Sequence, residues 1–210
     1  TLRVESSIPV DGLPEQVSLR PGDFAGCVEG LSVAVPGEVE IRLLHEDGSV
    51  AAAANPLRIV AEAPLVHYWG DLHGQSEETI GTGSARQYFE FARDRAFLDA
   101  TGHQGNDFQI TSPFWRELDA LCAEFDETGR FVAIPGYEWS GNTGLGGDRN
   151  IYFPEEGRVL RRSSHALVED RSDLDTDANS AAELFAALAA NREWDVVGYA
   201  HCGGRYADVK

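Results

Sequence analysis

The stretch VHYWGDLHGQS, residues 66–76, carries an apolar run into an acid and a histidine that stand two positions apart, Asp71 and His73. The run is typical of a buried strand, and the Gly74 after it cannot easily continue one. A strand that ends on a carboxylate and an imidazole indicates either a metal site or a capped strand end with one hydrogen-bonded histidine. The rest of the chain has to distinguish the two.

Beyond residue 66, strand-like and helix-like segments alternate along the chain. The apolar spacing predicts helices over 85–98, 114–128 and 181–193, with Ser84, Ser112 and Ser180 as their caps and Gly129 closing the second. Strands are expected over 66–73, 98–103, 130–138, 149–153 and 195–201. This alternation predicts an α/β fold with a parallel sheet, either a barrel or an open doubly wound sheet.

The first part of the chain has a different pattern, without a helical period. Residues 24–35 and 37–60 alternate as strands do, and Glu46-Asp47-Gly48 supplies a hairpin turn. We therefore expect a small all-β, sandwich-like domain over 1–62, a short junction over 61–64, and the β/α domain over 66–210.

Composition narrows the range of partners. A formal net charge of -18 repels phosphate backbones, so nucleic acid is not expected as a partner, whereas divalent cations suit such a chain. No apolar run approaches the roughly 20 residues that span a bilayer, so no membrane segment is expected. Cys27, Cys122 and Cys202 lie at no metal-finger spacing and are expected to be reduced and mostly buried, which favours the cytoplasm. The start at Thr1 and the absence of Met indicate a piece of a longer protein.

The most informative pattern is the residue at which each expected strand ends. His73, His103, Glu138 and His201 end four of them. The carboxyl ends of parallel strands face one side of a β/α fold, so these residues are expected to meet there. Imidazole and carboxylate are the usual ligands of zinc, manganese and iron. Gly-rich segments follow three of these strands and predict loops that bring backbone close to a ligand.

Four motifs in this order resemble the PHP (polymerase and histidinol phosphatase) superfamily of metal-dependent phosphoesterases: YWGDLHGQS, LDATGH, PGYEWSGNTGLGGDRNIYF and AHCGGRYAD. More narrowly, residues 30–210 look like a bacterial branch that places a β-domain before the barrel. The resemblance implies a distorted β/α barrel with two or three metal ions at the carboxyl ends of its strands.

The resemblance also assigns roles to single residues. Asp71 and His73 match the first motif, with Gln75 in its last position, and Thr101 and His103 match the second, where Gly102 replaces an acid. Glu138 is expected to bridge metals, and His201 matches a later motif with Cys202 in its variable place. The ambiguous further ligands are Asp148 and His165. A final Asp-X-His motif does not occur after His201, so the chain is expected to hold only the amino-terminal portion of a barrel.

The function implied is hydrolysis of a small-molecule phosphate ester. His73, His103, Glu138 and His201 would hold the metals, Asp71 would orient a ligand histidine, and Arg149 or Arg205 would clamp the phosphate. Three alternatives stay open: a metal hydrolase of an amide or another ester, a non-catalytic binding module with a degenerate site, and a Cys202 nucleophile. The last is disfavoured because adjacent strand residues such as His201 and Cys202 point to opposite faces.

Overall fold

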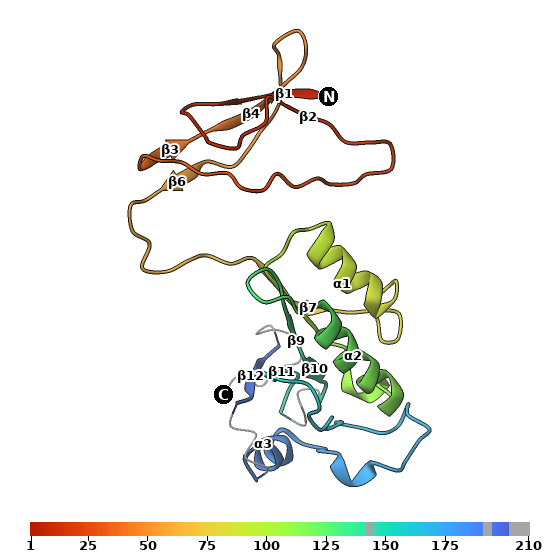
Figure 1. Cartoon of the computed structure of the whole chain (residues 1–210). Helices are drawn as coiled ribbons and strands as arrows, with labels where there is room; N and C mark the ends of the chain where they lie inside the picture. The colour runs from red at the N-terminus through yellow and green to blue at the C-terminus, as the bar shows by residue number, and fades with distance from the viewer. Residues whose placement is uncertain (142–143, 145, 191–194, 202–210) are drawn as a thin grey trace. The chain divides into compact units, whose positions relative to one another are not determined.

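The computed structural model describes residues 1–141, 144, 146–190 and 195–201 (Figure 1). The chain divides into two compact units, Thr1–His67 and Tyr68–Lys210. The division expected from the sequence, at 62–66, lies a few residues before this boundary. Among the described residues, no helix is both long and apolar enough to cross a membrane.

The first unit consists of short antiparallel strands. One sheet has the order β2-β1-β4-β5, and a second pairs β3 with β6. Glu46–Gly48 forms the expected hairpin turn between β4 and β5, with Gly48 at a φ of 83° that favours glycine. The bounds of the strands are β1 Leu2–Ser6, β2 Gln16–Val17, β3 Gly37–Val39, β4 Ile41–Leu44, β5 Val50–Ala53 and β6 Leu57–Ile59.

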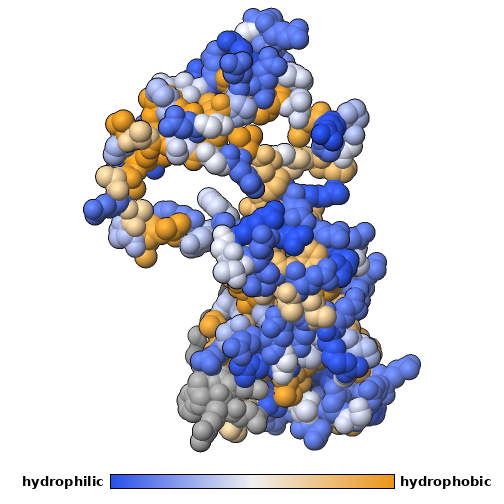
Figure 2. Space-filling model, viewed as in Figure 1, coloured by the Kyte–Doolittle hydropathy of each residue, from blue (hydrophilic) through white to orange (hydrophobic). Residues whose placement is uncertain are grey.

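The strand predicted over 24–35 does not form. Only Ser32 takes part in a β-bridge, with Asp11. Two glycines, Gly26 and Gly30, interrupt the segment, and Gly30 adopts a φ of 75° that breaks an extended strand. Apolar side chains of this segment consequently reach the surface of the first unit, among them Phe24. Figure 2 shows that the visible face of the molecule carries both hydrophobic and hydrophilic residues.

The second unit begins its helices where capping residues occur. Helix α1, Ala85–Asp94, starts at Ser84, whose hydroxyl accepts a hydrogen bond from the Gln87 N–H while the Gln87 side chain accepts one from the Ser84 N–H. Helix α3, Ala181–Ala190, starts after Ser180, whose hydroxyl accepts from the Glu183 N–H. Both caps are those predicted from the sequence.

Helix α2 differs from the prediction at both ends. It spans Ser112–Phe125, and its N-cap is Thr111, whose hydroxyl accepts from the Phe114 N–H. Ser112 is the first helical residue instead, and its hydroxyl donates to Asp173. The helix ends at Phe125 with Asp126 as its C-cap, so Gly129 lies beyond it in a separate turn at a φ of 80°.

Two three-stranded sheets complete the second unit. Strands β7 (Gly70–Gly74), β8 (Ala100–His103) and β9 (Val132–Ile134) pair in parallel. The strand predicted over 66–73 thus begins only at Gly70, and the apolar side chains before it, such as Val66 and Trp69, are exposed instead of buried. Strands β10 (Gly136–Trp139), β11 (Arg149–Tyr152) and β12 (Val197–Ala200) pair antiparallel in that order. Two short 3-10 helices, Asp107–Gln109 and Leu174–Thr176, lie in the connections.

The single strand expected over 130–138 is divided at Pro135. Proline has no N–H to donate to a ladder, and the chain changes sheets there, from β9 to β10. The parallel pairing predicted throughout therefore holds only for β7, β8 and β9. The β11 strand returns antiparallel to β10, and β12 consequently lies antiparallel to β11 and runs in the same direction as β10.

The strands that carry the expected ligands nevertheless point the same way. The Glu138 N–H donates to the Gly105 carbonyl oxygen over 2.9 Å, which links β10 in parallel to the segment after β8. The carboxyl ends of β7, β8, β10 and β12 are thereby brought together. A closed barrel is not formed by the described residues, and the PHP-type barrel stays a prediction.

The hydrophobic core of the second unit lies between its helices and its sheets. Phe89 of α1 packs against Phe125 of α2, and Tyr137 of β10 packs against Trp115 of α2. Trp139 is fully buried, and its indole N–H donates to the Ala178 carbonyl oxygen. The core thus fixes β10 on the side of its odd-numbered residues, which leaves Glu138 on the opposite face.

Candidate metal centre

Three of the predicted ligands lie together. His73, at the end of β7, Glu138, on β10, and His201, directly after β12, each offer one ligand atom within 4.8 Å of the others. His73 Nε2 lies 3.6 Å from Glu138 Oε2, and His201 Nδ1 lies 3.3 Å from Glu138 Oε1. The two imidazole rings stack with centroids 4.2 Å apart. This triad joins residues from three separate strands of the second unit.

The separations suit a first-row divalent ion. Bonds of about 2.0–2.2 Å in tetrahedral geometry place ligand atoms roughly 3.3–3.6 Å apart. The distances from the two imidazoles to Glu138 fall at these values, with His73 measured to Oε2 and His201 to Oε1. Two histidines and one glutamate form a donor set found in catalytic zinc sites. The chemistry of the donors therefore fits a metal ion, and one ligand atom from each residue lies within 4.8 Å of the others.

Two carboxamides hold the Glu138 carboxylate. Asn106 Nδ2 donates to Glu138 Oε2 over 2.9 Å, and Gln75 Nε2 approaches the same oxygen at 3.4 Å. The pKa of Glu138 is raised to about 7, first by burial and then by the negative charges of Asp148 and Asp107. A bound cation would offset this repulsion, because it favours the ionised carboxylate.

His73 is held on its other side by Asn150. The Nδ1 atom of His73 lies 2.9 Å from Asn150 Oδ1, on the β11 strand. Partial burial lowers the pKa of His73, and proximity to His201 lowers it further. Both effects favour the neutral imidazole, which is the form that binds metal.

His103 is placed differently from the triad. Its ring is buried, with Nε2 2.8 Å from the Ser76 hydroxyl and Nδ1 accepting the Gly105 N–H over 3.2 Å. Burial lowers the pKa of His103 to about 4, with a smaller effect from His73. Because Nδ1 accepts a hydrogen bond, Nε2 carries the proton and donates to Ser76. His103 thus stands in a hydrogen-bonded pair outside the triad.

The two acids expected beside the site, Asp71 and Asp148, lie next to the triad without belonging to it. The Asp71 carboxylate accepts from the backbone N–H of His73 over 3.0 Å, so it orients the main chain of that residue rather than its ring. Asp148 is buried, its carbonyl oxygen accepts the His201 N–H, and its charge acts on Glu138. The structure does not bring either carboxylate into the triad.

His165 belongs to a separate buried cluster. Its Nδ1 lies 2.8 Å from Asp177 Oδ2 and its Nε2 3.2 Å from Asp173 Oδ1, and Asp173 also pairs with the fully buried Arg162. The two carboxylates occupy opposite nitrogens of the ring. This arrangement is a buried cluster of polar contacts around the His165 ring and gives no common site for a metal ion.

Of the two predicted phosphate clamps, only Arg149 lies among the described residues, and it is not brought to the triad. Arg149 precedes Asn150 on β11, so its side chain leaves from the opposite face, and its guanidinium donates to the Gly146 carbonyl oxygen. Arg205 and Cys202 lie outside the described residues. Of the other cysteines, Cys122 is buried as expected, whereas Cys27 is exposed because its segment forms no strand.

The carboxamide side chains around the triad are the residues that sequence reasoning misses. Gln75 stands where the resemblance expects a further ligand, but it donates to Glu138. Asn106 and Asn150 carry no expected role, yet each contacts a triad residue directly. A sequence signal does exist for Asn150, because it is a polar residue that directly precedes the apolar run Ile151-Tyr152-Phe153.

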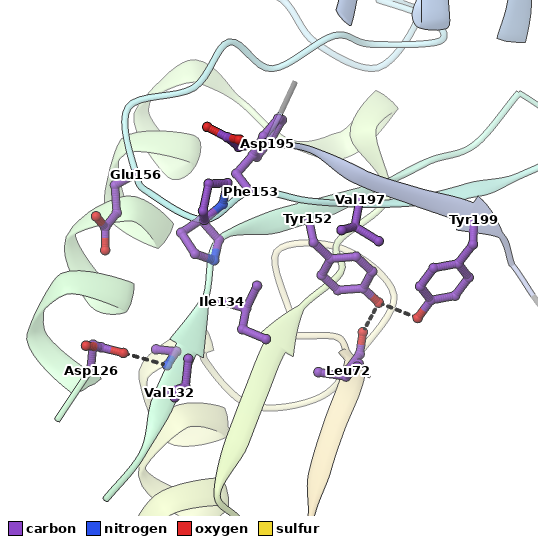
Figure 3. A pocket seen from close by; sticks show the side chains of 13 residues that line it. Leu72, Asp126, Val132, Ile134, Tyr152, Phe153, Glu156, Asp195, Val197 and Tyr199 are labelled. Carbon is purple, nitrogen blue, oxygen red and sulfur yellow. Dashed lines mark hydrogen bonds between the residues drawn. The ribbon is translucent and has the colours of Figure 1, made fainter. Parts of the chain in front are cut away.

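A pocket of about 500 Å³ lies elsewhere on the sheets, lined by residues such as Leu72, Tyr152 and Tyr199 and by no residue of the triad (Figure 3). Tyr199 lies two residues before His201 and shares its side of the chain, and Tyr152 lies two residues after Asn150 and shares its face of β11. The two phenol oxygens lie 2.9 Å apart, and the Tyr152 hydroxyl donates to the Leu72 carbonyl oxygen.

Tyr152 also packs over Gly102, where an added Cβ would lie 3.2 Å from its ring. A side chain at position 102 would therefore be tightly packed against the Tyr152 ring.

Comparison with known proteins gives distant relatives. An uncharacterized protein of Chlamydia pneumoniae is 25% identical over 123 residues, which are 58% of this chain and 20% of that protein. An uncharacterized protein of Chlamydia trachomatis is 24% identical over 123 residues with the same coverage. No family model matches the chain, and no solved structure matches it. The matched stretch spans about a fifth of the length of these relatives, whose names assign them no activity.

Proposed function

We propose that this chain carries the metal centre of a hydrolase whose substrates are phosphate esters. The observation that carries the proposal is the convergence of His73, Glu138 and His201 at strand ends, with ligand atoms within 4.8 Å of one another. Zinc, manganese and iron all accept this donor set. The motif resemblance to the PHP superfamily supports the choice of phosphate esters.

The residues of the chain have separate tasks in this proposal. His73, Glu138 and His201 hold a divalent ion, which when bound supplies Lewis-acid activation of water and of an ester oxygen. Asn106 fixes one oxygen of Glu138 by donating to it, so that the other stays directed at His201. The His73 and His201 side chains are partly exposed, so that substrate can reach the triad from solvent.

Glu138→Gln tests the metal centre. We expect protein purified without chelator to contain zinc, manganese or iron by plasma mass spectrometry, and Glu138→Gln and His201→Ala to lose most of it, because each removes one ligand. His45→Ala is the matched control, since that exposed histidine lies in the first unit. A metal content that is the same in all variants would contradict the metal centre.

The substrate class is tested on metal-loaded protein. Phosphate monoesters and diesters are compared with simple amides and carboxylic esters. Phosphate release that disappears in Glu138→Gln supports the proposal. Turnover restricted to amides or carboxylic esters would reassign the bond that is cleaved, and no turnover in metal-loaded protein would favour a binding module.

A further inference from the structure

The contact between His73 and Asn150 determines which nitrogen of His73 faces the triad. His73 Nδ1 and Asn150 Oδ1 are 2.9 Å apart, and they belong to residues 77 positions apart in sequence. Asn150 is 3% exposed, so water does not compete freely for its carboxamide. A carboxamide oxygen only accepts hydrogen bonds, so with Asn150 Oδ1 facing the ring this contact is a hydrogen bond when the neutral ring carries its proton on Nδ1.

We propose that Asn150 is a positioning residue, which holds His73 in the Nδ1–H tautomer and directs the lone pair of Nε2 at Glu138. The inference rests on the proposed metal centre for its purpose, but the tautomer itself is a property of the metal-free protein. The opposite tautomer would place a proton on Nε2, where it blocks metal binding.

The surroundings of Asn150 favour this arrangement. In the sheet, Asn150 stands opposite Glu138 on β10 and opposite Tyr199 on β12, so its backbone is fixed on both sides. The separation between His73 Nε2 and Glu138 Oε2 is 3.6 Å, longer than a normal N–H···O hydrogen bond. A proton on Nε2 would therefore gain no good hydrogen bond from Glu138, whereas a proton on Nδ1 has one at 2.9 Å.

A neutral acceptor at position 150 also suits a site that already holds several carboxylates. Glu138 already stands near Asp148 and Asp107, and their charges act on it. An aspartate at position 150 would accept the same proton but would add a further negative charge. Asparagine supplies the acceptor without that charge. The negative charge that attracts a divalent ion therefore comes from Glu138 and not from residue 150.

The test reads the tautomer directly. Two-bond proton–nitrogen correlation spectra of metal-free, nitrogen-15-labelled protein distinguish Nδ1–H from Nε2–H rings, and His73→Gln identifies the His73 signals. We expect His73 to be Nδ1–H in the natural chain and to lose that preference in Asn150→Leu, which has a similar volume and no acceptor. A His73 ring that is Nε2–H in the natural chain would overturn the proposal, whether or not any variant folds.

Metal affinity gives the second measurement. Loss of a hydrogen-bond partner behind a ligand typically weakens metal binding by about 10–100-fold. We expect that loss for Co²⁺ in Asn150→Leu, followed by its absorption spectrum, and substantial recovery in Asn150→Asp, which restores an acceptor. Asn179→Leu is the matched control, because its side-chain amide donates to the Ser163 carbonyl oxygen, away from the triad.

The outcomes separate the two proposals. An Nδ1–H ring in a protein that binds no metal would refute the metal centre and leave the role of Asn150 in place. Unchanged Co²⁺ affinity in a folded Asn150→Leu would refute the positioning role and leave the metal centre standing.

Discussion

His73 and His103 both end a parallel strand, yet their side chains have opposite surroundings. His73 remains partly exposed beside Glu138, whereas His103 is 2% exposed and bonds to Ser76 and Gly105. The difference lies in the partners that each ring can reach. A buried imidazole ring that has both a donor and an acceptor as partners is stable as a neutral group. Burial disfavours its charged form and so lowers its pKa.

The burial of His103 predicts a pH dependence of stability. Its pKa is about 4 in the folded protein and near 6.5 when unfolded, so below pH 6.5 the unfolded state binds the extra proton. The stability that the neutral ring contributes is complete above pH 6.5 and is lost as the pH falls towards 4. At pH 5 the loss amounts to about 2 kcal/mol.

The measurement compares urea unfolding of the natural chain and His103→Gln at pH 7 and pH 5. We expect the natural chain to lose about 2 kcal/mol more than the variant over this range, because glutamine does not titrate. The comparison cancels the titration of His73 and of the carboxylates, which both proteins share. Equal losses in the two proteins would show that His103 is not held as a buried neutral ring.

At the scale of elements, helix starts were predictable because a cap is a contact between residues three positions apart. Ser84 and Ser180 cap α1 and α3 as expected. For α2 the neighbouring Thr111 takes the cap, because Ser112 bonds to Asp173, which lies 61 residues away. A local pattern does not contain that long-range bond, and so it indicates the wrong hydroxyl.

The capping box of α1 gives a prediction for Ser84→Ala. Removal of the hydroxyl leaves the Gln87 N–H without its acceptor, which we expect to lower the free energy of unfolding by about 1 kcal/mol. Ser84→Asp retains an acceptor and should stay near the stability of the natural chain. Urea unfolding followed by circular dichroism measures both variants, and an equal loss in Ser84→Asp would contradict capping as the cause.

At the scale of the whole molecule, the two units differ in how much apolar surface they bury. The main hydrophobic cluster consists entirely of residues from Ala85 onward, whereas Val39 and Leu44 are the buried hydrophobic residues of the first unit. The connection between the units exposes large side chains, with Leu65 80% and Trp69 75% exposed. The second unit is therefore expected to be the more stable of the two.

Limited proteolysis tests this difference. We expect the most resistant chymotrypsin fragment to begin between residues 66 and 70, after cleavage at Leu65, Tyr68 or Trp69, because the packed cluster from Ala85 onward protects the second unit from cleavage. Mass spectrometry of the fragment locates its first residue. A resistant fragment that begins near residue 1 would show instead that the first unit protects the connection.

Residue types and short-range spacing were enough to predict the local features and the candidate ligands near the strand ends. Helix caps, the hairpin at Glu46–Gly48 and the positions of His73, Glu138 and His201 follow from residue types and spacing over a few positions. The prediction that these three residues meet required one more assumption, that their strands run in the same direction. That assumption holds in the structure, although β12 reaches its place through an antiparallel neighbour.

The neighbours of each of these residues, in contrast, depend on the folded chain. The division of 130–138 at Pro135, the inward turn of His103 and the partnership of His73 with Asn150 depend on contacts between distant segments. The physical reason is that one histidine has two nitrogens and many possible partners, and packing selects among them only when separate strands come together. Sequence spacing places a ligand at a strand end, whereas the fold sets its orientation and its protonation.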